Sequence, residues 1–194
     1  MDRILLTDDE VVAAAAVLGG SWRAPLPTVA AEDASEMIKA AMRGRRSLEV
    51  RGLIQRGAVL EPRLAEVLTA LVRRRPDRIG YVGDVVDRSL LAGAAFAAFL
   101  DDGGGTLVVT TADGVNEFTR ATQSEIDEFM VAFVAAGRAE PSRSIVVVAP
   151  VDEATARFAV VTRESVSVGR GPIASLDLES GDEIAEFRTE LLVS

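Results

Sequence analysis

The chain has 194 residues, contains no histidine and no cysteine, and carries a formal net charge of −9. Its hydrophobic content of 48% is sufficient for a buried core, so we expect a single domain over residues 1–194. The missing cysteine excludes a disulfide scaffold and thiolate metal sites, and the missing histidine removes the usual proton-transfer group near neutral pH, so we expect a non-enzymatic protein with no cofactor and no metal ion.

The first 77 residues predict a helical segment. Thr7–Glu10 has the pattern of a capping box and starts a helix that runs to Gly19-Gly20. The stretch 21–31 contains two prolines and is typical of an extended connector. Its Trp22, the only tryptophan, is expected to pin this connector to the core.

Two further helices are predicted in this segment. Asp33 and Glu36 form a capping pair at the start of a helix that ends near Arg51-Gly52-Leu53. A third helix is predicted over 62–75, with proline at its first position and Pro76 ending it. The expected apolar stripe of the second helix consists of Met37, Ile38, Ala41, Met42 and Leu48.

From residue 78 the pattern changes to strands. Residues 79–86 are rich in β-formers, and 107–119 predicts a hairpin in which Asp113-Gly114 forms a type I′ turn. The alanine-rich stretch 88–100 is ambiguous, although its intrinsic propensity favours a helix. A capping box at Thr122–Glu125 then starts an amphipathic helix that Gly137 follows.

The last third of the sequence predicts strands followed by a helix. The strands are expected at 145–149, 158–162, 166–168 and 173–178. One more capping box, Ser180–Glu183, starts the final amphipathic helix.

An internal repeat relates the last two helices. A shift of 58 residues superposes Thr122–Phe129 on Ser180–Phe187, with the common pattern [T/S]-x-x-E-I-x-E-F. Upstream strand positions also match, although capped amphipathic helices can share this pattern by convergence. The repeat predicts an α+β fold, in which an N-terminal helical segment (1–77) precedes two halves (78–136 and 137–194), each a strand meander with a helix. The halves are expected to be related by a pseudo-twofold axis around a central, mainly antiparallel sheet.

Most motifs with catalytic or ligand-binding associations fail on context. Gly169–Ala174 fits the dinucleotide pattern G-x-G-x-x-A, but a strand rather than a helix is predicted after its glycines, which the repeat makes a hairpin turn. No P-loop and no G-x-S-x-G motif occurs. The carboxylate clusters Asp8/Asp9/Glu10, Asp84/Asp87 and Asp152/Glu153 are better explained as helix N-terminal or surface charge than as a magnesium site.

The distribution of charge bears on the partner. Residues 1–77 have a net charge of +1 and residues 78–194 of −10, which disfavours nucleic acid. The arginines at 43–46 and 73–75 fit helix C-terminal turns, but they leave an alternative open, a regulatory or nucleic-acid-binding module that uses residues 43–75. No uncharged stretch exceeds twelve residues, so we expect no membrane segment and a cytoplasmic protein.

The order of these features resembles the EspG family, cytosolic chaperones of mycobacterial type VII (ESX) secretion systems. The resemblance rests on Leu18-Gly19-Gly20, Pro25-x-Pro27, a long helix running into Arg51-Gly52-Leu53 with Gly57 behind it, a helix at 62–75, and duplicated strands and helices. It implies a non-enzymatic chaperone or adaptor that keeps PE–PPE heterodimers, or another helical client, soluble. It also implies that 88–100 contains a strand. The loop after that strand, Asp101, Asp102, Gly103, Gly104 and Gly105, would contact the protein partner.

Overall fold

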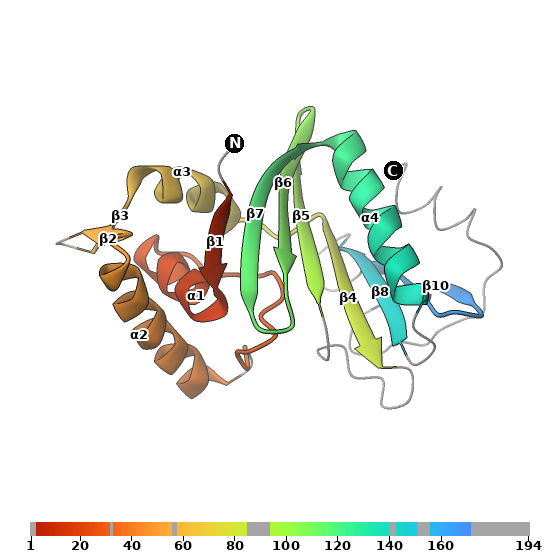
Figure 1. Cartoon of the computed structure of the whole chain (residues 1–194), viewed down its shortest axis with the longest axis horizontal. Coiled ribbons are helices and arrows are strands. Elements are labelled where there is room, and N and C mark those ends of the chain that lie inside the picture. The colour runs from red at the N-terminus through yellow and green to blue at the C-terminus, as the bar shows by residue number, and fades with distance from the viewer. Residues whose placement is uncertain are drawn as a thin grey trace.

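The structure is a computed structural model that describes residues 3–31, 33–55, 58–84, 94–139, 143–150 and 156–171. Over these residues the protein has four helices, an eight-stranded sheet and a two-stranded sheet. Figure 1 shows the N-terminal helices gathered beside one edge of the large sheet and α4 lying across its other half. The predicted α+β class with a central antiparallel sheet is confirmed.

The N-terminal segment begins with a strand that the sequence did not predict. β1 (Ile4–Thr7) pairs antiparallel with β7 (Val115–Thr122), with Ile4 opposite Phe118. The segment continues through α1 (Asp8–Val17), α2 (Ala34–Val50), β2 (Ile54–Gln55), β3 (Val59–Leu60) and α3 (Pro62–Leu71). Residues 1–77 and 78–136 therefore share one sheet, and the division of the chain into three segments stays a prediction.

The remaining strands form two antiparallel meanders that meet at the pair β4–β8. β4 (Arg78–Asp84), β5 (Ala95–Asp101), β6 (Gly104–Thr110) and β7 run outward on one side, and β8 (Arg143–Pro150), β9 (Ala156–Val161) and β10 (Val166–Gly171) on the other. The two meanders agree with the strand-meander halves that the repeat predicts. The predicted strand 173–178 and the helix from Ser180 lie outside the described residues.

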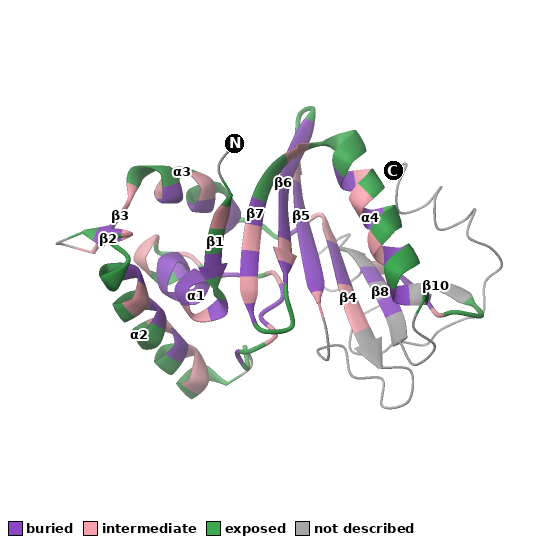
Figure 2. Ribbon diagram, viewed as in Figure 1, coloured by how far each residue is buried: buried purple, intermediate pink, exposed green. Residues whose placement is uncertain are grey.

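Each face of the sheet supports its own core, because successive strand residues point to opposite faces. Ala97 and Phe99 of β5 pack with α1, α3 and the connector in the first core. Phe96 and Ala98 pack with α4 (Gln123–Arg138) in the second. Figure 2 shows both cores as buried segments that line the strands.

The helix starts are confirmed at atomic detail. The Thr7 hydroxyl accepts a hydrogen bond from the Glu10 amide (3.3 Å), and the Glu10 carboxylate accepts one from the Thr7 amide (2.9 Å). The same reciprocal box starts α4 at Thr122. Asp33 caps α2 through the amides of the next turn, and Gly19, with φ of +66°, follows the end of α1.

Two predictions about helices are wrong in detail. α3 ends at Leu71, because the chain turns before Pro76 to enter β4. The buried line of α2 is Ala40, Gly44 and Leu48, whereas Ile38 and Met42 are 63% and 55% exposed. Small residues decide which face packs, since a Cβ on Gly44 would lie 1.8 Å from the Asp9 carbonyl oxygen of α1.

Three local predictions on strands are also corrected. Residues 95–101 form β5, so sheet pairing overrides the helical propensity of its alanines, as the family resemblance implies. In the 107–119 hairpin only Gly114 has positive φ (+73°), so the turn is not type I′. Gly169 and Gly171 lie within β10, paired with β9, rather than in the hairpin turn that the repeat predicts. Residues 172–174 of the dinucleotide pattern lie outside the described residues.

Candidate functional site

The five predicted partner-binding residues lie together at the tip of the β5–β6 hairpin. Asp101 ends β5 and pairs with Gly104 of β6, while Asp102 and Gly103 form the turn. Gly103 has φ of +87°, a conformation that other residues rarely adopt. Asp101, Asp102 and Gly103 are exposed, whereas Gly104 and Gly105 are buried. The role of these residues in binding a partner stays a prediction.

The other two glycines of the hairpin have a packing role. A Cβ on Gly104 would lie 2.4 Å from the Ala121 carbonyl oxygen, and one on Gly105 would lie 2.4 Å from that of Phe99. Both obstacles are backbone atoms of neighbouring strands and cannot move aside. These glycines therefore permit close strand approach next to the turn of the hairpin.

A groove of about 320 Å³ lies beside this hairpin, between α3 and the strands β1, β6 and β7. Phe118 and Thr106 are buried at its floor, and half-buried Ile4 and Val67 contribute to its walls. In Figure 1 α3 lies beside β1 and the upper part of β7, the region that supplies these residues. The remaining residues that line the groove are Arg3, Arg63, Glu66, Ala70, Thr119 and Arg120.

Arg120 connects the groove to the predicted hairpin. It lines the groove, and its guanidinium donates a hydrogen bond of 2.8 Å to the carboxylate of Asp101. A second arginine of the groove, Arg3, forms an ion pair of 2.9 Å with Glu117. The groove and the hairpin tip are thus one continuous surface with an apolar floor and arginines at its rim.

Sequence reasoning missed the groove because its residues are far apart in the chain. They come from positions 3–4, 63–70, 106 and 118–120, and the β1–β7 pairing brings the first and last groups together. The arginines of the N-terminal segment could have indicated this site. Sequence reasoning considered those at 43–46 and 73–75, whereas Arg3 and Arg63 line the groove.

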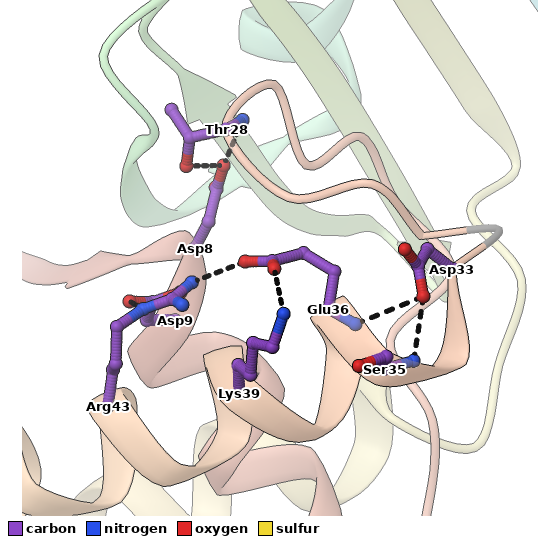
Figure 3. A network of polar contacts seen from close by, with 8 residues as sticks. All are labelled: Asp8, Asp9, Thr28, Asp33, Ser35, Glu36, Lys39 and Arg43. Atoms are coloured by element: carbon purple, nitrogen blue, oxygen red, sulfur yellow. Dashed lines mark hydrogen bonds and ion pairs between the residues drawn. The ribbon is translucent and has the colours of Figure 1, made fainter.

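The arginine clusters singled out in the sequence make contacts within the protein. Arg43 of α2 donates to the carboxylates of Asp9 (2.7 Å) and Glu36 (2.9 Å), and these hydrogen bonds raise its pKa above the usual value (Figure 3). Arg45 forms an ion pair of 2.9 Å with Glu49. The Arg43–Asp9 contact links α2 to α1, whereas the contacts with Glu36 and Glu49 lie within α2. None of the arginines of this cluster lies in the last turn of α2, where sequence reasoning placed them.

In the second cluster, Arg74 attaches the chain after α3 to the end of β5 next to the hairpin turn. It donates hydrogen bonds to the Leu100 carbonyl oxygen (2.7 Å) and to the Asp77 carboxylate (3.2 Å). That carboxylate also accepts the amide of Leu100 at 2.7 Å. The segment after α3 is thereby attached to the hairpin that carries the predicted site.

The carboxylates Asp8, Asp9 and Glu10 point to different partners. Asp8 is fully buried and accepts hydrogen bonds from the amide (2.9 Å) and hydroxyl (2.7 Å) of Thr28 and the side-chain amide of Asn116 (2.8 Å). Figure 3 shows Asp8 directed towards Thr28 and Asp9 towards Arg43. Asp8 lies in the first turn of α1, as expected for helix N-terminal charge, but it is not surface charge, because its buried side chain links α1, the connector and β7.

Glu10 is also buried, with 1% of its surface exposed. Besides capping α1, its carboxylate accepts hydrogen bonds from Ser47 (2.6 Å) and Arg51 (2.6 Å) of α2 and its C-terminal turn. Over the described residues no group of three acidic side chains converges in the manner of a metal site. Asp87, Asp152 and Glu153 lie outside those residues.

Trp22 packs against the sheet as predicted and forms part of the support beneath the groove. It is 7% exposed, and its ring lies 5.9 Å from that of Phe99 and 5.8 Å, edge to face, from that of Phe118. Phe118 in turn contributes to the floor of the groove. The connector thus packs, through Trp22, against a residue that lines the candidate site.

Among the described helices, none combines the length and the apolar composition that crossing a bilayer requires. No protein-family model matches the sequence, and no curated protein matches it significantly. The candidate site is therefore defined by its own geometry: an exposed β5–β6 hairpin tip joined through Arg120 to an apolar groove with an arginine rim.

Proposed function

We propose that the protein is a non-enzymatic, cytosolic chaperone or adaptor that binds helical secretion substrates of the PE–PPE type in a type VII secretion system. The observation that carries this proposal is the groove of about 320 Å³ between α3 and β7. A groove with an apolar floor suits the helix-in-groove mode of recognition, in which side chains spaced by three or four residues insert from one helix face.

The physical basis is the protection of apolar surface. A client helix that exposes an apolar stripe associates with other molecules unless another surface covers it. Covering it requires shape and apolar contact and needs no proton transfer, in keeping with a chain that lacks histidine and cysteine. The β5–β6 hairpin, which projects beside the groove, would contact the client through Asp102 and Gly103.

The hairpin gives a direct test by co-expression with a PE–PPE heterodimer. We expect the heterodimer to remain soluble and to co-elute with the wild-type protein in size-exclusion chromatography. Asp102→Arg, at the hairpin tip, should weaken co-elution. Asp113→Arg provides the matched control, because it places the same charge change in an exposed turn at the opposite end of β6. A heterodimer that stays insoluble and never co-elutes would contradict the proposed function.

A further inference from the structure

The charges that line the groove are distributed unevenly between its two walls. On the α3 wall Arg63 and Glu66 lie one turn apart and balance each other in formal charge. On the strand wall the charged residues that line the groove are Arg3 and Arg120, both exposed. The charged side chains that line the strand wall of the groove are thus positive, although the protein has a net charge of −9.

The carboxylates that pair with these two arginines lie on the protein surface. Glu117 holds Arg3 and Asp101 holds Arg120, with side chains that are 31% and 35% exposed, and the arginines themselves are 74% and 47% exposed. Solvent-exposed ion pairs of this kind contribute little to stability. An incoming carboxylate can therefore replace Glu117 or Asp101 at low free-energy cost.

From these two observations we propose that the groove selects a client helix whose apolar stripe is bordered by carboxylates, which pair with Arg3 and Arg120. This inference rests on the proposed function and adds the chemistry by which a client is distinguished. Apolar side chains of the helix contact Ile4, Val67 and Phe118, and its Glu or Asp side chains lie against the strand wall. A helix bordered by lysine places like charges against both arginines and is rejected.

The test uses the full-length chain and two labelled synthetic helical peptides of about 20 residues, long enough to hold helical structure in water. Both carry leucines at a helical spacing, and they differ only in having Glu or Lys beside the stripe. Fluorescence anisotropy measures each affinity. The Glu side chains exchange with Glu117 and Asp101 at little net gain, whereas the Lys side chains place like charges beside both arginines, so we expect the Glu peptide to bind about fivefold more tightly.

Two sets of variants locate the effect. The double variant Arg3→Gln/Arg120→Gln should abolish the preference, whereas Arg45→Gln/Arg46→Gln, which removes two exposed arginines of α2, should preserve it. Ala70→Trp fills the groove and should weaken the Glu peptide at least tenfold. Its control, Thr69→Trp, adds the same ring at the neighbouring exposed position of α3 that does not line the groove.

The outcomes separate this inference from the proposed function. Equal affinity for the two peptides, or a preference that survives Arg3→Gln/Arg120→Gln, overturns the selection of carboxylates. Binding that Ala70→Trp leaves unchanged overturns the groove as its location. If neither peptide binds while the heterodimer still co-elutes with the protein, the inference fails and the proposed function stands.

Discussion

Replacing Gly44 by alanine tests the packing of α2 on α1, the contact that builds the N-terminal side of the molecule. An alanine Cβ at this position would lie 1.8 Å from the carbonyl oxygen and 2.2 Å from the carbonyl carbon of Asp9. Ordinary contacts are about 3.5–4 Å. Because the obstacle is the backbone of another helix, a change of side-chain rotamer cannot relieve the clash.

Two opposing terms set the magnitude. Alanine is a better helix former than glycine by about 1 kcal/mol, which alone would stabilise α2. Overpacking costs about 1–3 kcal/mol and more when neighbours cannot shift. Separating the helices also weakens the bonds of buried Glu10 to Ser47 and Arg51 across the same interface. We therefore expect a net loss of about 2–4 kcal/mol in the free energy of unfolding, and a fall in Tm of about 5–15 °C.

Urea denaturation followed by circular dichroism measures this change. Arg46→Ala is the matched control, because it introduces alanine at an exposed position of the same helix and should alter the free energy of unfolding by no more than about 0.5 kcal/mol. If Gly44→Ala equals or exceeds the wild type in stability, α1 and α2 do not approach as described and the reasoning is refuted.

Three further predictions concern the polar contacts. Asp8→Ala should lower the free energy of unfolding by about 2–4 kcal/mol in urea titrations, because it leaves buried donors without an acceptor; an unchanged midpoint would contradict its structural role. Arg51→Ala should destabilise by about 1–3 kcal/mol by leaving Glu10 buried without its ion pair. In the double variant Arg51→Ala/Glu10→Gln, part of this loss in the free energy of unfolding should be recovered. If the losses of the two single variants simply add in the double variant, Arg51 and Glu10 do not interact as described. Hydrogen bonds from Thr122 lower the pKa of Glu125, so its capping contribution is present above its ordinary pKa of 4.5 and lost as pH falls below it. The Tm difference between wild type and Glu125→Gln should therefore shrink from pH 7 to pH 3, and Glu128→Gln should show no such capping-dependent change.

Local sequence patterns predicted the features that depend on few neighbouring residues. The capping boxes at Thr7 and Thr122 place helix starts at the observed residues, because the cap is formed within one turn. Apart from β5, the described strands after residue 78 were located in the same way from alternation and turn residues. The hairpin tip at Asp102-Gly103 was located through the family resemblance, which implied that the alanine-rich stretch contains a strand.

Features that depend on distant pairing were not predictable from local patterns. β1 is a strand because Ile4–Thr7 pairs with β7, more than a hundred residues later, and the groove exists only as a result of that pairing. The buried line of α2 was misjudged because hydrophobicity favours Ile38 and Met42, whereas close helix approach favours Gly44. Likewise, the contacts that bury Asp8 and Glu10 were not predictable, because their partners Asn116 and Ser47 lie on other elements.

We propose that this protein covers the apolar surface of a helical client through its groove. Light scattering of a purified PE–PPE heterodimer, diluted from denaturant with one equivalent of the protein, measures this protection most directly. We expect the wild-type protein to suppress aggregation, Thr69→Trp to do so equally, and Ala70→Trp not to do so. Aggregation at the same rate with and without the wild-type protein would contradict the claim.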